Sequence, residues 1–280
     1  MPVQIQQILQ ILRILQIHNV GEIIMSLTLD LNCDMGESFG AWTMGHDAEI
    51  MPYISSANIA CGYHGGDPGV MRETVACARE HGVAIGAHPG LPDLQGFGRR
   101  AMAITEQEAY DMVVAQIGTL AGVAASQGTR LNHVKAHGML YNMAVKDRAL
   151  ARGIARAVHD VDSSLVFFGL AGSHMLDEAR ALGLTAAGEV FGDRSYQPDG
   201  SLTPRSKPGA MITEVNQSIE QVLRMVKESA VIAQDGSSVT VKADTLCLHG
   251  DQPDAVDFAV AIRAALKGHD IAVKAMASSH

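Results

Sequence analysis

The chain has 280 residues, of which 47% are hydrophobic and 18% charged, and this composition is typical of a globular protein large enough for one α/β domain. Its 30 acidic and 21 basic residues give a net charge of −9, which argues against a nucleic-acid or anionic-membrane surface. The cysteines form no CxxC pair, so we expect free thiols in a reducing cytoplasm; they are Cys33, Cys61, Cys77 and Cys247.

Residues 1–24 show an amphipathic helical pattern without a basic n-region or a small-residue cleavage site. The segment is too short and too often interrupted by Gln to span a bilayer. We interpret it as an N-terminal extension, either disordered or a single helix. The alternative is that this segment forms a contact between copies of the chain, so a homo-oligomer stays an open possibility. Residues 25–276 are then expected to form one catalytic domain.

Short apolar runs alternate with helical segments along the rest of the chain. Asp67 before Pro68, and the capping box from Thr105 to Glu108, mark two helix starts. Residues 237–243 predict either a partial further strand or a β-ribbon. The alternation predicts a mainly parallel sheet with right-handed crossovers. The predicted strands cover 27–32, 55–60, 83–87, 131–136, 165–170, 184–190 and 244–250, and the predicted helices 68–82, 105–126, 139–160, 173–182, 209–228 and 253–267.

Ionisable residues follow almost every predicted strand at its C-terminal end, as in NCDMGE (32–37), CGYHGGD (61–67) and FGDRSY (191–196). The opposite strand ends are plain connectors. Ionisable residues at the same end of nearly every strand predict a TIM-like, distorted (β/α) barrel of about seven parallel strands. In such a barrel the loops after the strands build the pocket at this rim. An open doubly wound sheet is the alternative, with its ligand at one switch point.

Several rim residues are candidates for catalysis. Asp34 and Glu37 suit a general base or a metal ligand, although a helix cap is the plainer interpretation. Lys135 and His137 lie two residues apart at a strand end, so their side chains share a face. A lysine inside a strand is costly unless it is paired, and Asp34 or another rim acid is the expected partner.

Other rim residues suit ligand binding. Arg99 and Arg100, in the long loop after His88, can clamp an anionic group with their planar guanidinium groups. His249 and Asp251 follow the last predicted strand, where Asp251 is equally suited to cap a helix. Histidines from different strands converge in a closed barrel, so metal binding stays open, but no HExxH spacing supports it. The chain contains no GxSxG elbow, P-loop or GxGxxG fingerprint.

A family resemblance rests on six segments that occur in order along residues 27–273. Together they resemble the LamB/YcsF family, whose members form the A subunit of bacterial ATP-hydrolysing 5-oxoprolinase. The resemblance implies a seven-stranded barrel of the glycoside hydrolase/deacetylase superfamily type. It also implies opening of 5-oxo-L-proline to L-glutamate with ATP and Mg²⁺, together with B and C subunits. The segments are DLNCDMGESFG (30–40), SANIACGYHGGDP (56–68), IGAHPGLPDLQGFGRR (85–100), VKAHGMLYN (134–142), EVFGDRSYQPDGSLTPRSKPGAMI (189–212) and CLHGDQP (247–253).

The implied reaction suggests roles for the candidates. After ATP phosphorylates the amide oxygen, Asp34 or Glu37 activates water, Lys135 stabilises negative charge on the oxygen, and His64 or His137 protonates the departing nitrogen. Deacetylases of the superfamily hold a divalent metal through Asp and His, but their paired-histidine spacing is absent here. Two alternatives remain: a metal-dependent amidase or carbohydrate deacetylase, and a non-catalytic lactam-binding scaffold. The expected substrate-binding residues are Asn58, His88, Arg99, Arg100, Arg194, His249 and Asp251.

Overall fold

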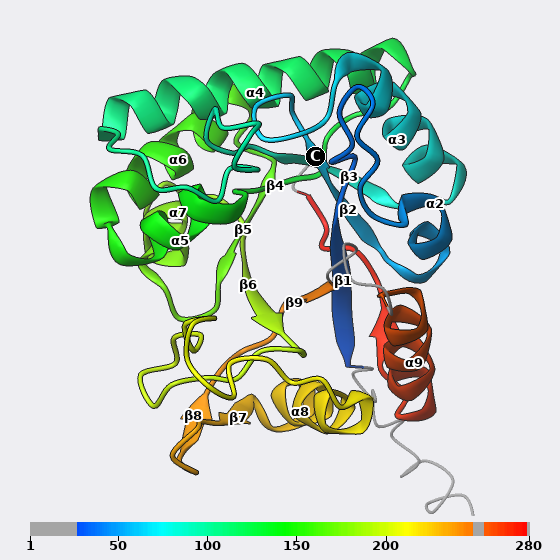
Figure 1. Ribbon diagram of the computed structural model, residues 1–280, viewed down its shortest axis with the longest axis vertical. Helices are drawn as coiled ribbons and strands as arrows, with labels where there is room; N and C mark the ends of the chain where they lie inside the picture. The colour runs from blue at the N-terminus through cyan, green and yellow to red at the C-terminus, as the bar shows by residue number, and fades with distance from the viewer. Residues whose placement is uncertain (1–26, 249–254, 279–280) are drawn as a thin grey trace, which may run out of the picture.

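The computed structural model describes residues 27–248 and 255–278, and a closed barrel of parallel strands forms its centre (Figure 1). Seven strands succeed one another around the barrel, and the last pairs with the first to close it. The predicted barrel is therefore confirmed, and the open-sheet alternative is wrong. In order around the barrel the strands are β1 (Thr28–Met35), β2 (Ser56–Ala60), β3 (Ala84–His88), β4 (His133–Lys135), β5 (Val166–Leu170), β6 (Ala186–Phe191) and β9 (Thr245–Leu248).

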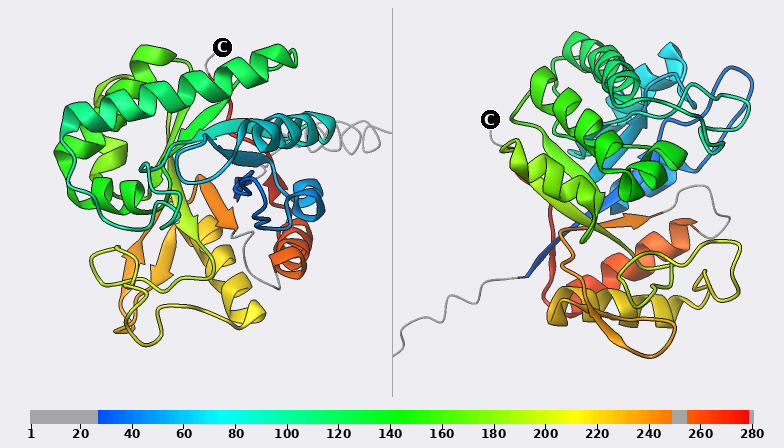
Figure 2. Two further views of the ribbon diagram at one scale, coloured as in Figure 1. Left: turned by 45° about the horizontal axis from the view of Figure 1, so that its top comes forward. Right: turned by 90° about the vertical axis from the view of Figure 1, so that its left-hand side faces the viewer.

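Helices surround this barrel on the outside (Figure 1, Figure 2). Two predicted helix starts are confirmed. The Asp67 side chain accepts hydrogen bonds from the backbone N–H groups of Gly69 and Val70, and Thr105 and Glu108 form a reciprocal capping box. The helices are α2 (Asp47–Ile50), the 3₁₀ helix η1 (Met51–Tyr53), α3 (Pro68–Glu80), α4 (Glu106–Ser126), α5 (Gly138–Lys146), α6 (Arg148–Val161), α7 (His174–Ala181), α8 (Val215–Glu228) and α9 (Ala255–Gly268).

The single helix predicted over 139–160 is wrong, because two helices meet at Asp147. The backbone of Asp147 is extended, and its side chain accepts hydrogen bonds from the N–H groups of Ala149 and Leu150, so it caps the second helix. The helix predicted from residue 209 begins only at Val215. Residues before it join the preceding loop instead, since the Ile212 N–H donates to the Asp193 carbonyl.

Residues 237–243 do not add a barrel strand. Within them β8 (Ser238–Thr240) pairs antiparallel with β7 (Ala230–Ile232), so the β-ribbon interpretation is confirmed. The two-residue strand β10 (Ala272–Val273) lies parallel to the start of β1 and was not predicted from the sequence. No helix among the described residues is long and apolar enough to cross a membrane. The predicted N-terminal extension, residues 1–24, lies outside the described residues.

Side chains alternate along β1 between the two faces of the barrel wall. Leu29, Leu31 and Cys33 are buried in the apolar layer shared with the helices, whereas Asp30 and the alternate residues after it enter the polar lumen. The other strands repeat this pattern, so hydrogen-bonding groups fill much of the lumen. The polar residues of the interior are Asp30, Asn32 and Asp34 on β1, Ser56 and Asn58 on β2, His133 and Lys135 on β4, Glu189 on β6, and Thr245 and Cys247 on β9.

Candidate active site

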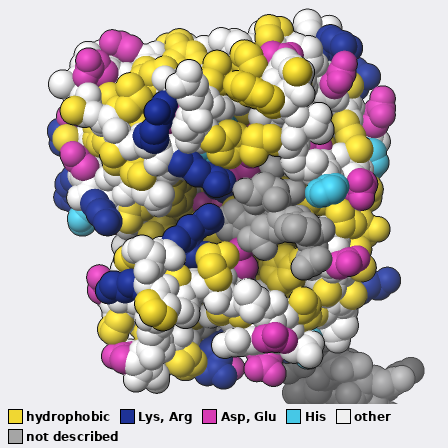
Figure 3. All heavy atoms as spheres, in the orientation of Figure 1, with side chains coloured by type: hydrophobic (Ala, Val, Ile, Leu, Met, Phe, Trp, Pro, Cys, Tyr) yellow, Lys and Arg dark blue, Asp and Glu magenta, His cyan; other side chains and the backbone are white. Residues whose placement is uncertain are grey.

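A cavity of about 270 Å³ lies at the carboxyl ends of the strands. Lys and Arg side chains gather around a hollow near the centre of the face shown in Figure 3. Such a pocket, with apolar walls and a few charged groups, suits a small anionic ligand. It is lined by the charged or polar residues Asp34, Lys135, His137, Glu189, Asn142, Tyr141, Cys247, Arg99, Arg194 and Arg205, and by the less polar Ala136, Gly138, Met139, Phe191 and Leu202.

Lys135 is the most densely paired group of the pocket floor. Its Nζ lies 2.8 Å from Asp34 Oδ1 and 2.8 Å from Glu189 Oε1. It also donates to Asn32 Oδ1 at 3.1 Å and to Cys247 Sγ at 3.1 Å. The predicted pairing of this buried lysine with Asp34 is therefore confirmed, and Glu189 is a second acidic partner. The surrounding acceptors hold the ammonium group at the bottom of the cavity.

Asp34 and Lys135 stabilise each other's charged forms. Burial alone raises the pKa of Asp34, but the charges of His88 and Lys135 outweigh burial and hold that pKa well below its usual range. Burial likewise disfavours a charged Lys135, yet Asp34 and the other acidic neighbours raise the pKa of the lysine well above its usual value. The pocket floor thus presents a carboxylate beside an ammonium group.

Asn58 lies beneath the pocket and does not line it. Its side-chain N–H groups donate to Asn32 Oδ1 and Asp34 Oδ1, each at 2.8 Å, and its Oδ1 accepts from His133 Nε2 at 2.8 Å. Gly86 makes room for the His133 ring, since a Cβ at this position would overlap it. Burial lowers the pKa of His133 to about 3, so this imidazole is neutral. The structure therefore places Asn58 where it orients Asp34.

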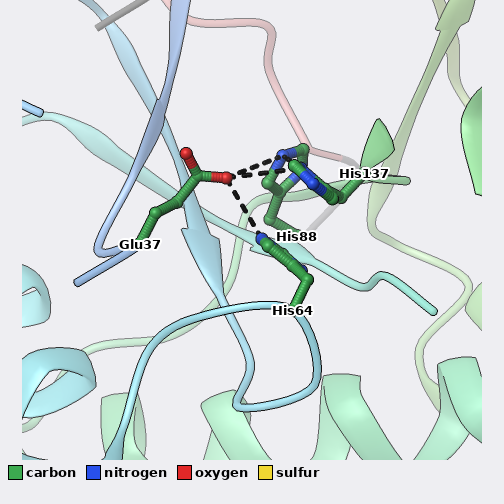
Figure 4. Close-up of side chains that lie close together, drawn as sticks. All are labelled: Glu37, His64, His88 and His137. Carbon is green, nitrogen blue, oxygen red and sulfur yellow. Dashed lines mark hydrogen bonds and ion pairs between the residues drawn. The ribbon is translucent and has the colours of Figure 1, made fainter. Parts of the chain in front are cut away.

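Four side chains from the carboxyl ends of β1 to β4 meet beside the pocket: Glu37, His64 and His137 in the loops and His88 as the last residue of β3 (Figure 4). Glu37 Oε1 lies 3.1 Å from His64 Nε2, 3.3 Å from His137 Nδ1 and 3.9 Å from His88 Nε2. The rings of His64 and His137 stack with their centroids 3.6 Å apart. Each residue offers one ligand atom, and these atoms all lie within 4.8 Å of one another, so this group could hold a metal ion.

The glycine-rich loops allow this close approach. A Cβ at Gly90 would lie 2.5 Å from His64 Nδ1, so a larger residue there would displace the ring. Burial lowers the pKa of His64 well below its usual value and that of His137 to about 3, which keeps both imidazoles neutral. His88 also contacts the pocket floor, because its Nε2 lies 3.3 Å from Asp34 Oδ2.

The structure separates the predicted arginines. Arg194 is buried in the pocket wall, where its Nη2 donates to the Thr203 carbonyl at 2.7 Å; its Nε has no hydrogen-bond partner among residues 27–248 and 255–278. Arg99 also lines the pocket, above the ring of Phe97. Arg100 instead forms an ion pair with Asp93 beside a different hollow. His249 and Asp251 lie outside the described residues.

Several residues of the pocket were not expected from the sequence. Glu189 carries the clearest signal, because it is a lone charge within the apolar run 184–190. A charge in such a strand requires a partner, just as Lys135 does. Cys247 stands out in the sequence only as a cysteine near the rim, and its contact with the lysine depends on barrel closure. Tyr141 and Arg205 reach the pocket from a helix and a long loop, for which the sequence sets no register.

The fold and the pocket define a (β/α)-barrel protein with a cavity of charged side chains at the carboxyl ends of its strands. Residues 29–280 match the model of the LamB/YcsF family, and the chain belongs to this family. The family expected from the six sequence segments is therefore confirmed.

Relatives match this chain over nearly their whole length. The 5-oxoprolinase A subunit of Bordetella parapertussis is 66% identical over 251 residues, which are 90% of this chain and 100% of the relative. The protein of the same name from Bacillus subtilis is 56% identical, over 89% of this chain and 96% of the relative. The crystal structure of a lactam utilization protein from Thermus thermophilus has a TM-score of 0.85 at 49% identity, over 89% of this chain and 100% of that chain.

Proposed function

We propose that this chain is the A subunit of ATP-dependent 5-oxoprolinase, a hydrolase that opens 5-oxo-L-proline to L-glutamate while ATP is hydrolysed to ADP and phosphate. The observation that carries this proposal is the 66% identity to a 5-oxoprolinase A subunit over that relative's entire length. The pocket supports it, because a small cavity with a lysine and several arginines suits a compact lactam that bears one carboxylate.

The proposed chemistry begins with a stable amide. Phosphorylation of the lactam oxygen by ATP makes the ring carbon open to attack by water. Asp34 is the ionised carboxylate of the pocket floor and orients this water as general base. Because the lactam oxygen now carries the phosphoryl group, Lys135 stabilises the negative charge that develops on the oxygen supplied by the attacking water. The C–N bond then breaks, and a second water releases the phosphate from the acyl phosphate so formed.

The departing nitrogen needs a proton, and the Asp34 carboxyl, which has taken one from the attacking water, returns it in this scheme. His137 also lines the pocket, but its imidazole is neutral and its one N–H donates to the Phe97 carbonyl, so we assign it no proton transfer. Arg194 and Arg99 face the substrate carboxylate in this scheme, because both line the cavity and Arg194 has an unused N–H donor among the described residues. Arg100 takes no part, since it pairs with Asp93 elsewhere.

Other components of the reaction belong to the same proposal. The relatives are named as A subunits, which supports an assembly with B and C subunits. ATP enters as a co-substrate with Mg²⁺, and the absence of a P-loop from the sequence favours a nucleotide site on one of the partner proteins. We place the enzyme in the cytoplasm, where the four free cysteines would stay reduced.

The test is a reconstitution in which purified B and C subunits are mixed with this chain, and L-glutamate and ADP are measured with 5-oxo-L-proline as substrate. We expect both products only when all three subunits are present. Equilibrium binding of ATP to the chain alone should be weak if the partners hold the nucleotide. Lack of glutamate from the complete mixture would refute the proposed function.

The cluster of three histidines and Glu37 favours a second candidate, a metal-dependent amidase or deacetylase. The two candidates differ in their need for ATP. Release of acetate from an acetylated sugar, or of glutamate from 5-oxoproline by the isolated chain without ATP, would favour the second. A non-catalytic lactam-binding scaffold would instead bind 5-oxoproline, and substitutions in the pocket would change its affinity without changing kcat.

A further inference from the structure

The ring orientations of two histidines in the cluster are fixed by backbone carbonyls. His88 Nδ1 donates to the carbonyl of Lys135 at 2.7 Å, and His137 Nε2 donates to the carbonyl of Phe97 at 2.8 Å. A neutral imidazole carries one N–H, so each ring presents a lone pair at its other nitrogen. Those nitrogens, His88 Nε2 and His137 Nδ1, lie only 3.1 Å apart.

Two lone pairs facing each other at this distance require a positive charge between them. A proton on His88 is one possibility, and it fits the 3.3 Å contact of His88 Nε2 with Asp34 Oδ2, but it does not account for the convergence of Glu37 Oε1 and His64 Nε2 on the same point. A metal ion is the other, and metal-bound histidines in proteins usually donate their second N–H to a carbonyl or carboxylate. Both His88 and His137 make such a contact, with the carbonyls described above.

The backbone of Phe97 is strained in the position that supports His137. Its φ is +54°, in the left-handed region that a bulky side chain seldom adopts. Such a conformation is unfavourable for a bulky residue and persists where the surrounding structure enforces it. Here it directs the carbonyl at His137 Nε2, while the Phe97 ring packs edge-on against the His64 and His137 rings. The strained residue thus holds one ligand and covers another.

Glu37 and His64 complete the donor set. Glu37 Oε1 faces His64 Nε2 and His137 Nδ1 at 3.1 and 3.3 Å. Four-coordinate ligands about 2.0–2.1 Å from a zinc ion stand roughly 3.4 Å from one another. Three separations, of 3.1, 3.3 and 3.1 Å, are close to this size. Glu37 Oε1 and His88 Nε2 are 3.9 Å apart and the whole set lies within 4.8 Å, so some ligands must draw closer to surround an ion. Imidazole nitrogens with one carboxylate suit zinc and neighbouring transition metals, in contrast to the all-oxygen sites of calcium and magnesium.

We propose that Glu37, His64, His88 and His137 bind one divalent first-row transition-metal ion, with zinc the best match to the donor set. This is the one cluster of its kind among residues 27–248 and 255–278. The inference rests on the geometry of the cluster and does not depend on the 5-oxoprolinase assignment. A divalent ion here adds Lewis-acid charge beside the pocket, since His137 lines both.

The test measures metal in the untagged full-length chain after dialysis against metal-free buffer. We expect about one zinc or related ion per chain by elemental analysis. A stripped sample should take up Co²⁺ with visible absorption bands typical of four-coordinate nitrogen and oxygen ligation. His88→Ala and His137→Ala should each lower the affinity for Zn²⁺ about a hundredfold or more. His64→Ala should cost less, because its Nδ1 has no hydrogen-bond partner among the described residues.

Two variants guard against misfolding and nonspecific binding. Glu37→Gln keeps the three imidazoles and nearly the shape of the side chain, and it should bind Zn²⁺ more weakly while its circular dichroism stays unchanged. His159→Ala removes an exposed histidine of α6 and should bind like the wild type. Zn²⁺ should raise the melting temperature of the wild type and of His159→Ala equally, and that of Glu37→Gln by less.

The proposal is overturned if the stripped wild type takes up neither Zn²⁺ nor Co²⁺ tightly, or if the folded His88→Ala chain binds them as the wild type does. These measurements need neither substrate nor partner proteins. Metal binding without glutamate formation in the reconstituted enzyme would therefore refute the proposed function and leave the metal site intact.

Discussion

Asp30 and Asp34 lie four residues apart on β1, and both side chains enter the barrel lumen, but their partners differ in kind. Asp30 is fully buried and accepts hydrogen bonds from the hydroxyl groups of Ser55, Ser56 and Thr245. Burial raises its pKa. Asp34 is 22% exposed at the pocket floor and pairs with the Lys135 ammonium group. Its pKa is held well below the usual range by neighbouring charges that outweigh its burial.

The comparison shows that the same residue type on the same strand face serves two purposes at two depths. Neutral hydroxyl groups satisfy the deeper carboxyl without providing charge, and no substrate reaches it. A charged partner keeps the upper carboxyl ionised where the cavity opens. Asn32 links the layers, since it donates to Thr245 and accepts from Lys135. We therefore expect substitutions in the upper layer to change activity and substitutions in the lower layer to change stability.

The largest effect is expected for Lys135→Met. Loss of the donor to the developing oxyanion should lower kcat about a thousandfold in the reconstituted enzyme. It should also lower the free energy of unfolding by about 3–5 kcal/mol, because Asp34 and Glu189 lose their buried counter-charge. Adding Glu189→Gln should restore part of the stability and none of the activity. Recovery of turnover in that double variant would contradict a catalytic role for Lys135.

A smaller effect is expected at the pocket wall. Arg194→Gln removes a charged donor facing the cavity, so KM for 5-oxoproline should rise about tenfold, equivalent to about 1.4 kcal/mol, with kcat little changed. Arg100→Gln is the matched control, because its guanidinium group pairs with Asp93 away from this cavity. Steady-state kinetics of both variants measure their KM and kcat for 5-oxoproline. Equal rises in KM would show that Arg100 reaches the substrate after all.

The lower layer should respond with the smallest change in activity. Asp30→Ala removes the carboxyl acceptor of three hydroxyl groups, of which Ser55 Oγ also donates to the Leu31 carbonyl. It should lower the free energy of unfolding by about 3 kcal/mol, with kcat within about threefold of the wild type. Denaturant unfolding and the glutamate assay measure the two quantities. A folded variant that loses activity a hundredfold would contradict the separation of the layers.

The stability loss of Asp30→Ala should be larger at low pH than at high pH. The pKa of Asp30 is raised in the folded chain, so between about pH 4 and that raised value the folded state binds more protons than the unfolded state. The wild type therefore loses stability from this group as the pH rises through the window, whereas Asp30→Ala lacks the effect. The stability difference between the two chains should be larger at pH 4 than at pH 8. A difference that grows with pH would mean that the folded-state pKa is lowered.

The sequence predicted the barrel and much of the pocket because both depend on local patterns. Ionisable residues at strand ends marked one rim, and the cost of burying a lysine was enough to identify Asp34 as a partner of Lys135. The six segments also identified the family. The barrel and the ion pair needed only the side-chain period of a strand, the cost of burying a charge and the rule that parallel strand ends meet, whereas the family rested on the six segments themselves.

The other features of the pocket depend on how loops and strands are placed in three dimensions, which no local sequence pattern specifies. Asn58 was expected to bind substrate, but hydrogen bonds on both sides place it under Asp34. Arg99 and Arg100 are adjacent in the chain, and only the loop geometry turns the first to the pocket and the second to Asp93. The histidine cluster lacks a metal-binding spacing because its members come from the ends of separate strands and the loops after them. Barrel closure assembles them.

The most direct test of the central claim is the rate of L-glutamate formation from 5-oxo-L-proline and ATP by the reconstituted enzyme containing Asp34→Asn, measured beside the wild type. The substitution preserves the shape of the side chain and removes its charge. We predict that the wild type forms glutamate and ADP together, and that the folded variant forms glutamate at least about a hundredfold more slowly. A variant that turns over at nearly the wild-type rate would contradict the assignment of the active site to this layer of the barrel.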